Sequence, residues 1–504
     1  MTPRAGREGS ALTRDIWSVP AVMIGVLLVL VVAQASKVAF YLDVLQASGL
    51  LYAVPVAAVL TLAVLISYPR LPLYTLAFLL PFNFVGGFWG DSIFVLIAKM
   101  AVTVVAVGTL IPALLAPAGD RAWITQTRLG FAVLLWLAAL ALGTLIGLVG
   151  APNRAYWLRE SSWMALYLCA LSFGTLLRGR RDITRLLVCV CGGVAALQAY
   201  AFWVLATGQR FARSDAWDAG GSFIRAPYSS QSLFVLYLAA AALLYYSSER
   251  RLNGRRFVVL FTAIAFLGGG LLASMGRALW LTGAVGMLVV LWNVEWDRRT
   301  IKAVAAVSAG AVLALAVVVV FDRLSPASSG NWTGSAATFL LDLASSESTS
   351  RVTRQIEWSN AVDVWLRSPL VGVGFGYPYP PITLGLPPEA EIPEAFFMHN
   401  SYLNILAKCG VFGLCALLYL IWVTLGVVRQ SLRRQADAYG RILGIALLAA
   451  LVQVTLLAAM VPVLTASDTA AYAGMLVGIA AAGQRAAKRE TADPPGHAAR
   501  MAGA

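Results

Sequence analysis

The stretch of sequence that decides the fold is HNSYLNILAKCGVFGLCALLYLIWVTLGVV, residues 399–428. It begins with two polar residues and continues as an apolar run longer than the about 20 residues that a helix needs to cross a bilayer. Similar apolar runs recur along the chain, which is 60% hydrophobic and only 12% charged. This composition is typical of a protein that crosses a membrane many times as α-helices.

We therefore predict an all-α polytopic membrane protein with about 12–14 transmembrane helices. The apolar runs that we assign to spans are 16–36, 44–67, 71–88, 92–115, 129–150, 161–177, 183–206, 230–247, 257–275, 278–294, 303–321, 401–428, 442–465 and 467–483. Along the chain, they predict a tail at 1–15, transmembrane helices at 16–321, a large loop at 322–400, transmembrane helices at 401–484 and a second tail at 485–504.

Lys and Arg are distributed unequally between the two sides of these predicted spans. The side that holds both tails carries 25 of the 38 basic residues, and the opposite side carries 11. Because basic residues are retained on the cytoplasmic side, we predict that both termini are cytoplasmic and that loop 322–400 lies outside. The net charge of +14 then reflects orientation and contact with anionic membrane lipids, and no nucleic-acid partner is indicated.

The loop 322–400 is too long to be a simple connection, and we expect it to contain a small structured unit. Within it, the run SRVTRQIEWSNAVDVWLRSP, residues 350–369, predicts a helix that Ser350 caps and Pro369 ends. Glycines alternate in the next run, VGVGFGYPYPP, residues 371–381, and permit tight turns. No strand-to-helix pattern accompanies these glycines, so no dinucleotide site is predicted.

The chain has only two histidines, His399 and His497. His497 lies in a polar tail that we interpret as disordered, whereas His399 lies where the large loop re-enters the membrane. An imidazole can take a proton from a hydroxyl near neutral pH without a metal, so His399 is the candidate catalytic base. A histidine at a helix start can also be a capping or interfacial residue, and Asn400 or Ser401 can cap the same helix. The residues alone leave both interpretations of His399 open.

Arginines on the predicted outer side form a second set of candidates, because an arginine at a membrane surface either anchors a helix or binds phosphate. Arg277, between two closely spaced spans, and Arg225, just before a span, are the strongest of them. The other candidates are Arg154, Arg159, Arg210, Arg213, Arg351 and Arg354. Lys99 and Lys408 fall within predicted spans, where a lysine either reaches the interface or lines a polar pocket.

The acidic residues argue against two other classes of protein. A coupled transporter usually places an Asp or Glu within a span, and all 24 acidic residues here fall in loops, tails or span ends. A metal-dependent glycosyltransferase would need clustered acids in an outer loop, yet the first outer loop offers only Asp43. Glu389, Glu391 and Glu394 do cluster near His399, and we interpret them as part of a solvated loop. We therefore predict neither a metal site nor a cofactor.

Together these residues resemble a known family, the bacterial O-antigen ligases and O-antigen polymerases, over roughly residues 222–419. The ligase signature is His, then Asn, Ser or Gln, then nine residues, Gly, two residues, and Gly, Thr or Tyr. Its four fixed positions are met in order by His399, Asn400, Gly410 and Gly413. A looser Arg-x-x-x-Leu element is met by Arg277 and Leu281.

The resemblance implies a GT-C-like membrane glycosyltransferase with its active site at the periplasmic face of the bacterial inner membrane. It implies a glycan donor carried on undecaprenyl diphosphate, lipid A-core as the acceptor, and inverting, metal-independent transfer. In this scheme His399 and Arg277 are catalytic, Arg277 and Arg225 hold the diphosphate, and Asn400 and Tyr402 shape the pocket.

Two alternatives stay open. A polymerase, which uses a second carrier-linked glycan as the acceptor, is the close one, because the predicted spans outnumber those common among ligases. A membrane transporter is the distant one.

Overall fold

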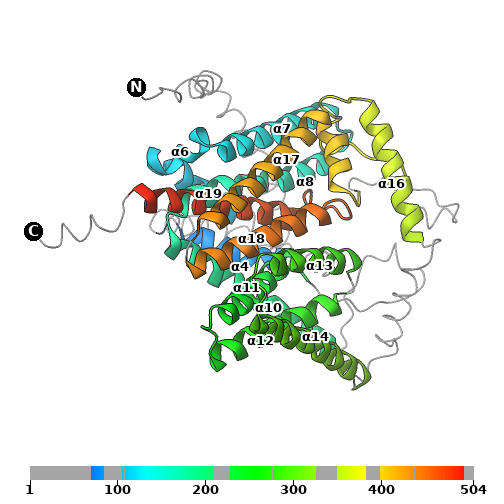
Figure 1. The fold of residues 1–504 in the computed structure, drawn as a ribbon. Helices are drawn as coiled ribbons and strands as arrows, with labels where there is room; N and C mark the ends of the chain where they lie inside the picture. The colour runs from blue at the N-terminus through cyan, green and yellow to red at the C-terminus, as the bar shows by residue number, and fades with distance from the viewer. Residues whose placement is uncertain are drawn as a thin grey trace, which may run out of the picture.

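The structure, a computed structural model, describes residues 68, 70–83, 105–106, 108–207, 228–274, 276–324, 349–381, 398–435 and 437–492. This part of the chain is α-helical, and no β-strand occurs within it (Figure 1). Six of its helices are long and apolar enough to cross a membrane, namely α7 (Arg128–Gly150), α10 (Arg180–Thr207), α11 (Ser230–Ser248), α12 (Gly254–Ala273), α17 (Ser401–Arg434) and α18 (Ala438–Leu457). The prediction of an all-α polytopic membrane protein is confirmed.

The remaining described helices complete the bundle. They are α4 (Leu71–Asn83), α6 (Ala118–Gln126), α8 (Arg154–Met164), α9 (Cys169–Leu176), α13 (Arg277–Trp292), α14 (Arg298–Leu324), α16 (Thr349–Leu366) and α19 (Ser467–Ala492). One difference from the sequence prediction is the span at 161–177. It is divided between α8 and α9 by a 3-10 turn, η4 (Ala165–Leu168), and the buried segment packs against α19. The predicted spans at 16–36 and 44–67 lie outside the described residues.

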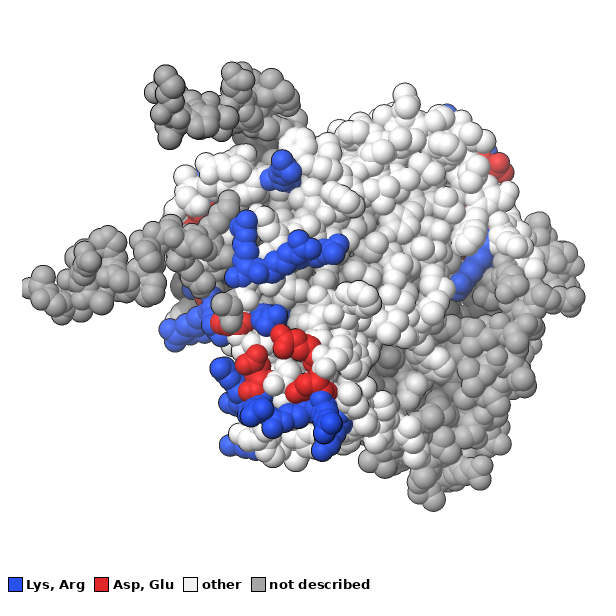
Figure 2. All heavy atoms as spheres, in the orientation of Figure 1, with Lys and Arg blue, Asp and Glu red and all other residues white. Residues whose placement is uncertain are grey.

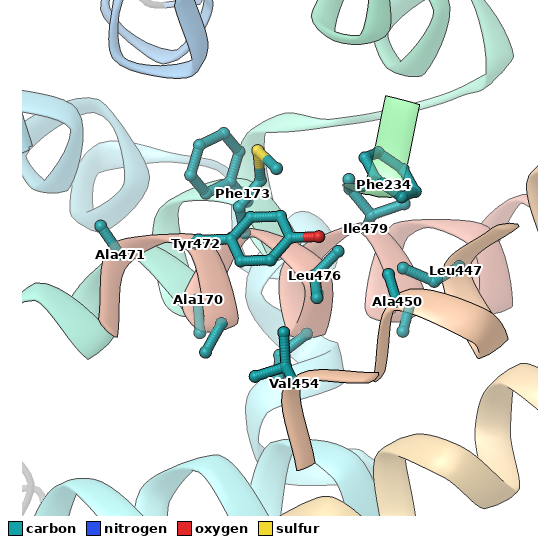
Figure 3. Packing of buried hydrophobic residues seen from close by; sticks show 14 of the residues in the cluster. Ala170, Phe173, Phe234, Leu447, Ala450, Val454, Ala471, Tyr472, Leu476 and Ile479 are labelled. Atoms are coloured by element: carbon teal, nitrogen blue, oxygen red, sulfur yellow. The ribbon is translucent and has the colours of Figure 1, made fainter. Parts of the chain in front are cut away.

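The main hydrophobic core lies where these helices meet. Helix α7 packs on α17, α19 packs on α9, and α18 packs on both α11 and α13. Figure 3 shows Tyr472 of α19 surrounded by Phe173 of α9, Phe234 of α11 and Val454 of α18. Helices α12 and α14 pair at one side of the bundle, and α16 stands at its edge, next to the start of α17 (Figure 1).

Helix α17 is broken at Gly410, whose φ of 66° and ψ of −169° are not helical. Before the break, the carbonyls of Ala407 and Lys408 accept hydrogen bonds from the backbone N–H groups of Val373 and Gly374, at 3.0 and 2.9 Å. After the break, the first two N–H groups donate to carbonyls of the same loop, at 2.9 and 3.1 Å. The loop therefore replaces the hydrogen bonds that the break removes, as a buried backbone requires.

The glycine-rich run at 371–381 is wedged between α17 and α7. Gly372, Gly374 and Gly376 all have positive φ, between 74° and 85°, which non-glycine residues adopt at a cost. A Cβ atom at Gly374 would lie 2.2 Å from the backbone nitrogen of Gly147 in α7. The glycines thus permit the tight turns that the sequence predicted, and they also let the loop backbone touch two spanning helices.

Helix α16 packs against the glycine-rich loop through a small, separate hydrophobic cluster. Its buried stripe repeats every three or four residues, at Thr353, Glu357, Ala361 and Val364. The last two of these pack with Tyr379, Met398 and Ala407 in a cluster separate from the main core. The helix ends before Pro369 as predicted, but it begins at Thr349, so Ser350 lies in its first turn and not at the cap.

Substitutions at two glycines of α17 test the packing of the loop against this helix. We expect Gly410→Ala to lower the stability of the protein by about 2 kcal/mol or more, because its φ is left-handed and the new Cβ would lie 2.3 Å from the carbonyl carbon of Leu370. Gly426→Ala, in the same helix with nothing within 4 Å, should be neutral or slightly stabilising. Thermal unfolding in detergent measures the stability of both variants. Equal melting temperatures would contradict the close packing of the loop against Gly410.

Candidate functional site

His399, the last residue before the N-cap of α17, is held by a carboxylate from α16. Its ring nitrogen Nδ1 lies 2.9 and 3.0 Å from the two carboxylate oxygens of Glu357. The backbone N–H of His399 also donates to Glu357 Oε2, at 3.0 Å. The Glu357 side chain is 6% exposed and that of His399 is 27% exposed. One buried carboxylate thus fixes both the backbone and the ring of a partly accessible histidine.

The position of Glu357 suits a negative charge. The N-terminus of α17 carries a partial positive charge from its aligned peptide dipoles. Asn400 is the N-cap of this helix, and its side-chain oxygen accepts from the N–H groups of Tyr402 and Leu403. A carboxylate beside this helix end is stabilised by the dipole and by the bond from His399.

This arrangement determines which ring nitrogen can do chemistry. A neutral histidine whose Nδ1 donates to a carboxylate carries its lone pair on Nε2. Nε2 can then accept a proton from a hydroxyl group, while the carboxylate stabilises the imidazolium that forms. Among the described residues, no group of three or more His, Cys, Asp and Glu side chains gathers in a way that could hold a metal ion.

The residues after His399 attach the start of α17 to α18. The hydroxyl of Ser401 donates to the carbonyl of Val461, and the hydroxyl of Tyr402 donates to the carbonyl of Thr455 at 2.7 Å. Asn400 therefore has the capping role that the sequence allowed, and the Tyr402 hydroxyl is engaged with a backbone carbonyl of α18.

A buried ion pair lies further along α17. Lys408 is fully buried, and its ammonium lies 3.2 Å from a carboxylate oxygen of Glu160 in the second half of α8. The same ammonium donates to the carbonyl of Tyr377, and Glu160 accepts from the N–H of Gly376. Lys408 thus lines a polar site, one of its two predicted roles, and joins α8, α17 and the glycine-rich loop.

Tyr379 packs beside the pair of Lys408 and Glu160. Its ring lies under the Lys408 ammonium, 4.8 Å from the ring centre, and its hydroxyl donates to the side-chain oxygen of Asn404 at 2.6 Å. Burial raises the pKa of Tyr379 well above its ordinary value, and the nearby charges of Glu160 and Glu357 raise it further. The phenol therefore stays neutral and donates its proton to Asn404.

The described candidate arginines lie on three helices, α8, α13 and α16. Arg154, at the start of α8, is exposed and donates to the carbonyl of Leu148 at the end of α7. Arg159 lies over the rings of Tyr156 and Trp163, 5.2 and 5.1 Å from their centres.

The three remaining described candidates are Arg277, Arg351 and Arg354. Arg277 is the first residue of α13, while Arg351 and Arg354 lie in the first two turns of α16. Three other candidates, Arg225, Arg210 and Arg213, lie outside the described residues.

Sequence reasoning missed the partners of the two basic residues. Glu357 could have been found, because it shares a helical face with Ala361 and Val364 and so points the same way as the apolar stripe. The pairing of Lys408 with Glu160 joins positions 248 residues apart, and no local pattern predicts it.

The fold and the site define a multi-pass membrane protein with a histidine–carboxylate pair where one spanning helix begins. Residues 262–418, which run from α12 into α17, match the family model of the O-antigen ligases. The predicted resemblance to the O-antigen ligase and polymerase family is thereby confirmed. No curated protein matches the chain significantly. This match supports an activity of the ligase or polymerase type in a multi-pass membrane protein.

The buried pair of Lys408 and Glu160 should be essential for the packing of the glycine-rich loop. Replacing Lys408 by Met leaves Glu160 as an uncompensated buried charge, and we expect a loss of about 3–5 kcal/mol. Adding Glu160→Gln removes that charge and keeps an oxygen for the N–H of Gly376. The double variant should therefore melt above Lys408→Met alone in detergent. A double variant that melts lower still, by the sum of the two single losses, would show that the charges do not interact.

Proposed function

We propose that this protein transfers a glycan from an undecaprenyl-diphosphate carrier to an acceptor hydroxyl at the periplasmic face of the inner membrane. The observation that carries the proposal is the Glu357–His399 pair at the start of α17, inside the region that matches the O-antigen ligases. The pair presents a general base at the end of a spanning helix. A membrane-bound carrier lipid would bring its sugar to that level of the bilayer.

The reaction is a single displacement. Nε2 of His399 takes the proton of the acceptor hydroxyl as its oxygen attacks the anomeric carbon of the donor sugar. The bond between that carbon and the diphosphate oxygen breaks, and the diphosphate leaves with the bonding electrons. Attack from the face opposite the leaving group inverts the anomeric centre, and Glu357 stabilises the imidazolium until its proton is released.

The leaving diphosphate needs positive charge, since negative charge develops on it in the transition state. We assign this role to Arg277 and Arg225, as the family resemblance implies. Arg277 opens α13 without a charged residue for 17 positions on either side in the sequence. In this scheme the protein needs no bound metal, because arginine guanidinium groups supply the positive charge.

Ligation to lipid A-core is the specific activity that we propose, with both termini in the cytoplasm. Polymerisation is the alternative, and it differs only in the acceptor. The two reactions share the donor, the base and the inverting displacement. The choice of acceptor in the assay therefore distinguishes ligation from polymerisation. Substitutions of His399 or Glu357 would affect both reactions alike.

The assay uses purified protein with an undecaprenyl-diphosphate-linked glycan, with and without lipid A-core. Product on lipid A-core identifies a ligase, and lengthened carrier-linked glycan from donor alone identifies a polymerase. The absence of product in both tubes would contradict the proposal and favour a transporter. Activity that a chelator abolishes would contradict the metal-independent mechanism.

Variants of the base test the mechanism in the same assay. His399→Ala should lower kcat by roughly 10²- to 10⁴-fold, the usual share of a general base. Glu357→Gln should lower kcat with little change in KM, because an amide NH₂ turned toward Nδ1 stabilises the wrong tautomer. Asp363→Asn, an exposed carboxylate on the same helix, is the matched control and should be unchanged. Full activity in His399→Ala would refute the mechanism.

A further inference from the structure

At the far end of α17 from His399, a pocket opens between α7, α17 and α19. Its volume is about 690 Å³, and three of its lining residues are Arg128 of α7 and Arg429 and Arg433 of α17. Amide side chains from Gln126, Gln430 and Gln484 also line it. The pocket lies some 28 residues beyond the start of α17, or roughly 40 Å along the helix. It is therefore separate from the proposed site of glycosyl transfer.

The arginines of this pocket differ from others at the same end of the bundle. Arg178 pairs with Asp120 at 2.9 Å, and Arg180 pairs with Asp437 at 2.7 Å. Within the described part of the chain, no carboxylate forms an ion pair with the three pocket arginines. Figure 2 shows basic side chains gathered toward the left of the view, in contrast to the almost uncharged surface to their upper right.

Favourable interaction with helix dipoles explains only some of the three pocket arginines. Arg429 and Arg433 lie one turn apart near the C-terminus of α17, where positive side chains stabilise the negative end of the helix dipole. Arg128 does the opposite, because it is the first residue of α7 and adds positive charge to the positive end of that helix. The helix dipoles therefore do not account for Arg128, and the three guanidinium groups that line the pocket together favour an anion.

The remaining lining residues indicate what kind of anion fits. Trp422, Val423 and Val427 of α17 and Leu129 of α7 give the pocket an apolar wall next to its arginines. Trp422 is 77% exposed on a spanning helix, as tryptophans at a membrane interface often are. An apolar wall that leads to guanidinium and amide donors matches a molecule with acyl chains and a phosphate head group.

We propose that this pocket binds the head group of an anionic phospholipid, with its phosphate between Arg128, Arg429 and Arg433 and its acyl chains along Trp422. Basic pockets between spanning helices have the charge and depth that such head groups need. The bound lipid would join the start of α7 to the end of α17, the two helices between which the glycine-rich loop packs. This inference does not depend on the proposed glycosyl transfer.

The test is lipid binding to the full chain, measured by native mass spectrometry after delipidation. Phosphatidylglycerol and phosphatidylcholine are titrated separately, and inorganic phosphate is added as a competitor. We expect phosphatidylglycerol to bind in preference to phosphatidylcholine. Its affinity should fall roughly fivefold in Arg433→Gln and roughly 30-fold in Arg429→Gln with Arg433→Gln.

Arg434→Gln is the matched control, because it removes the same charge from the next residue, which is exposed and does not line the pocket. It should bind phosphatidylglycerol like the wild type. An equal loss in Arg434→Gln would overturn the proposal in favour of diffuse surface charge. Equal binding of phosphatidylcholine would also overturn it. Displacement by inorganic phosphate at concentrations equal to the lipid would mean a site for a free anion and not for a lipid.

Discussion

The structure around His399 depends on one interruption, the left-handed residue Gly410 in the middle of α17. The break frees backbone groups of the helix, and the loop at 369–376 binds them on both sides. That loop follows α16 directly, so its attachment also sets where α16 lies. Glu357 of α16 then reaches His399 at the start of α17. A glycine eleven residues from the histidine in sequence thus helps to position the partner of its ring.

Two buried carboxylates stabilise this region in different ways. Glu160 compensates the buried charge of Lys408 and binds the glycine-rich loop, so it contributes to the fold. Glu357 binds a partly exposed histidine at a helix N-terminus, so in the proposed mechanism it orients the base. Tyr379 lies against the Lys408 ammonium and donates its hydroxyl proton to Asn404. Pairing the buried charges of Lys408 and Glu160 avoids the large cost of leaving either one alone.

The sequence predicted what depends on local pattern. Apolar runs of spanning length predicted the helices, and the proline at 369 predicted the end of α16. The family signature indicated His399 and Gly410, but the physical role of Gly410 needed the loop that binds its helix. The partners Glu357 and Glu160 come from distant segments, and which carboxylate reaches which base depends on packing that no local period encodes. Roles for Arg277 and Arg225 remain proposals from the resemblance.

The central claim is that Glu357 holds His399 with its proton on Nδ1 and its lone pair on Nε2. Nitrogen-15 NMR of imidazole-labelled protein measures this directly, because the chain has only two histidines and His399→Ala identifies the relevant signal. The account predicts the Nδ1–H tautomer for the neutral ring of His399 in the wild type, and a loss of that preference in Glu357→Gln but not in Asp363→Asn. A wild-type His399 with its proton on Nε2, or a tautomer unaffected by Glu357→Gln, would contradict it.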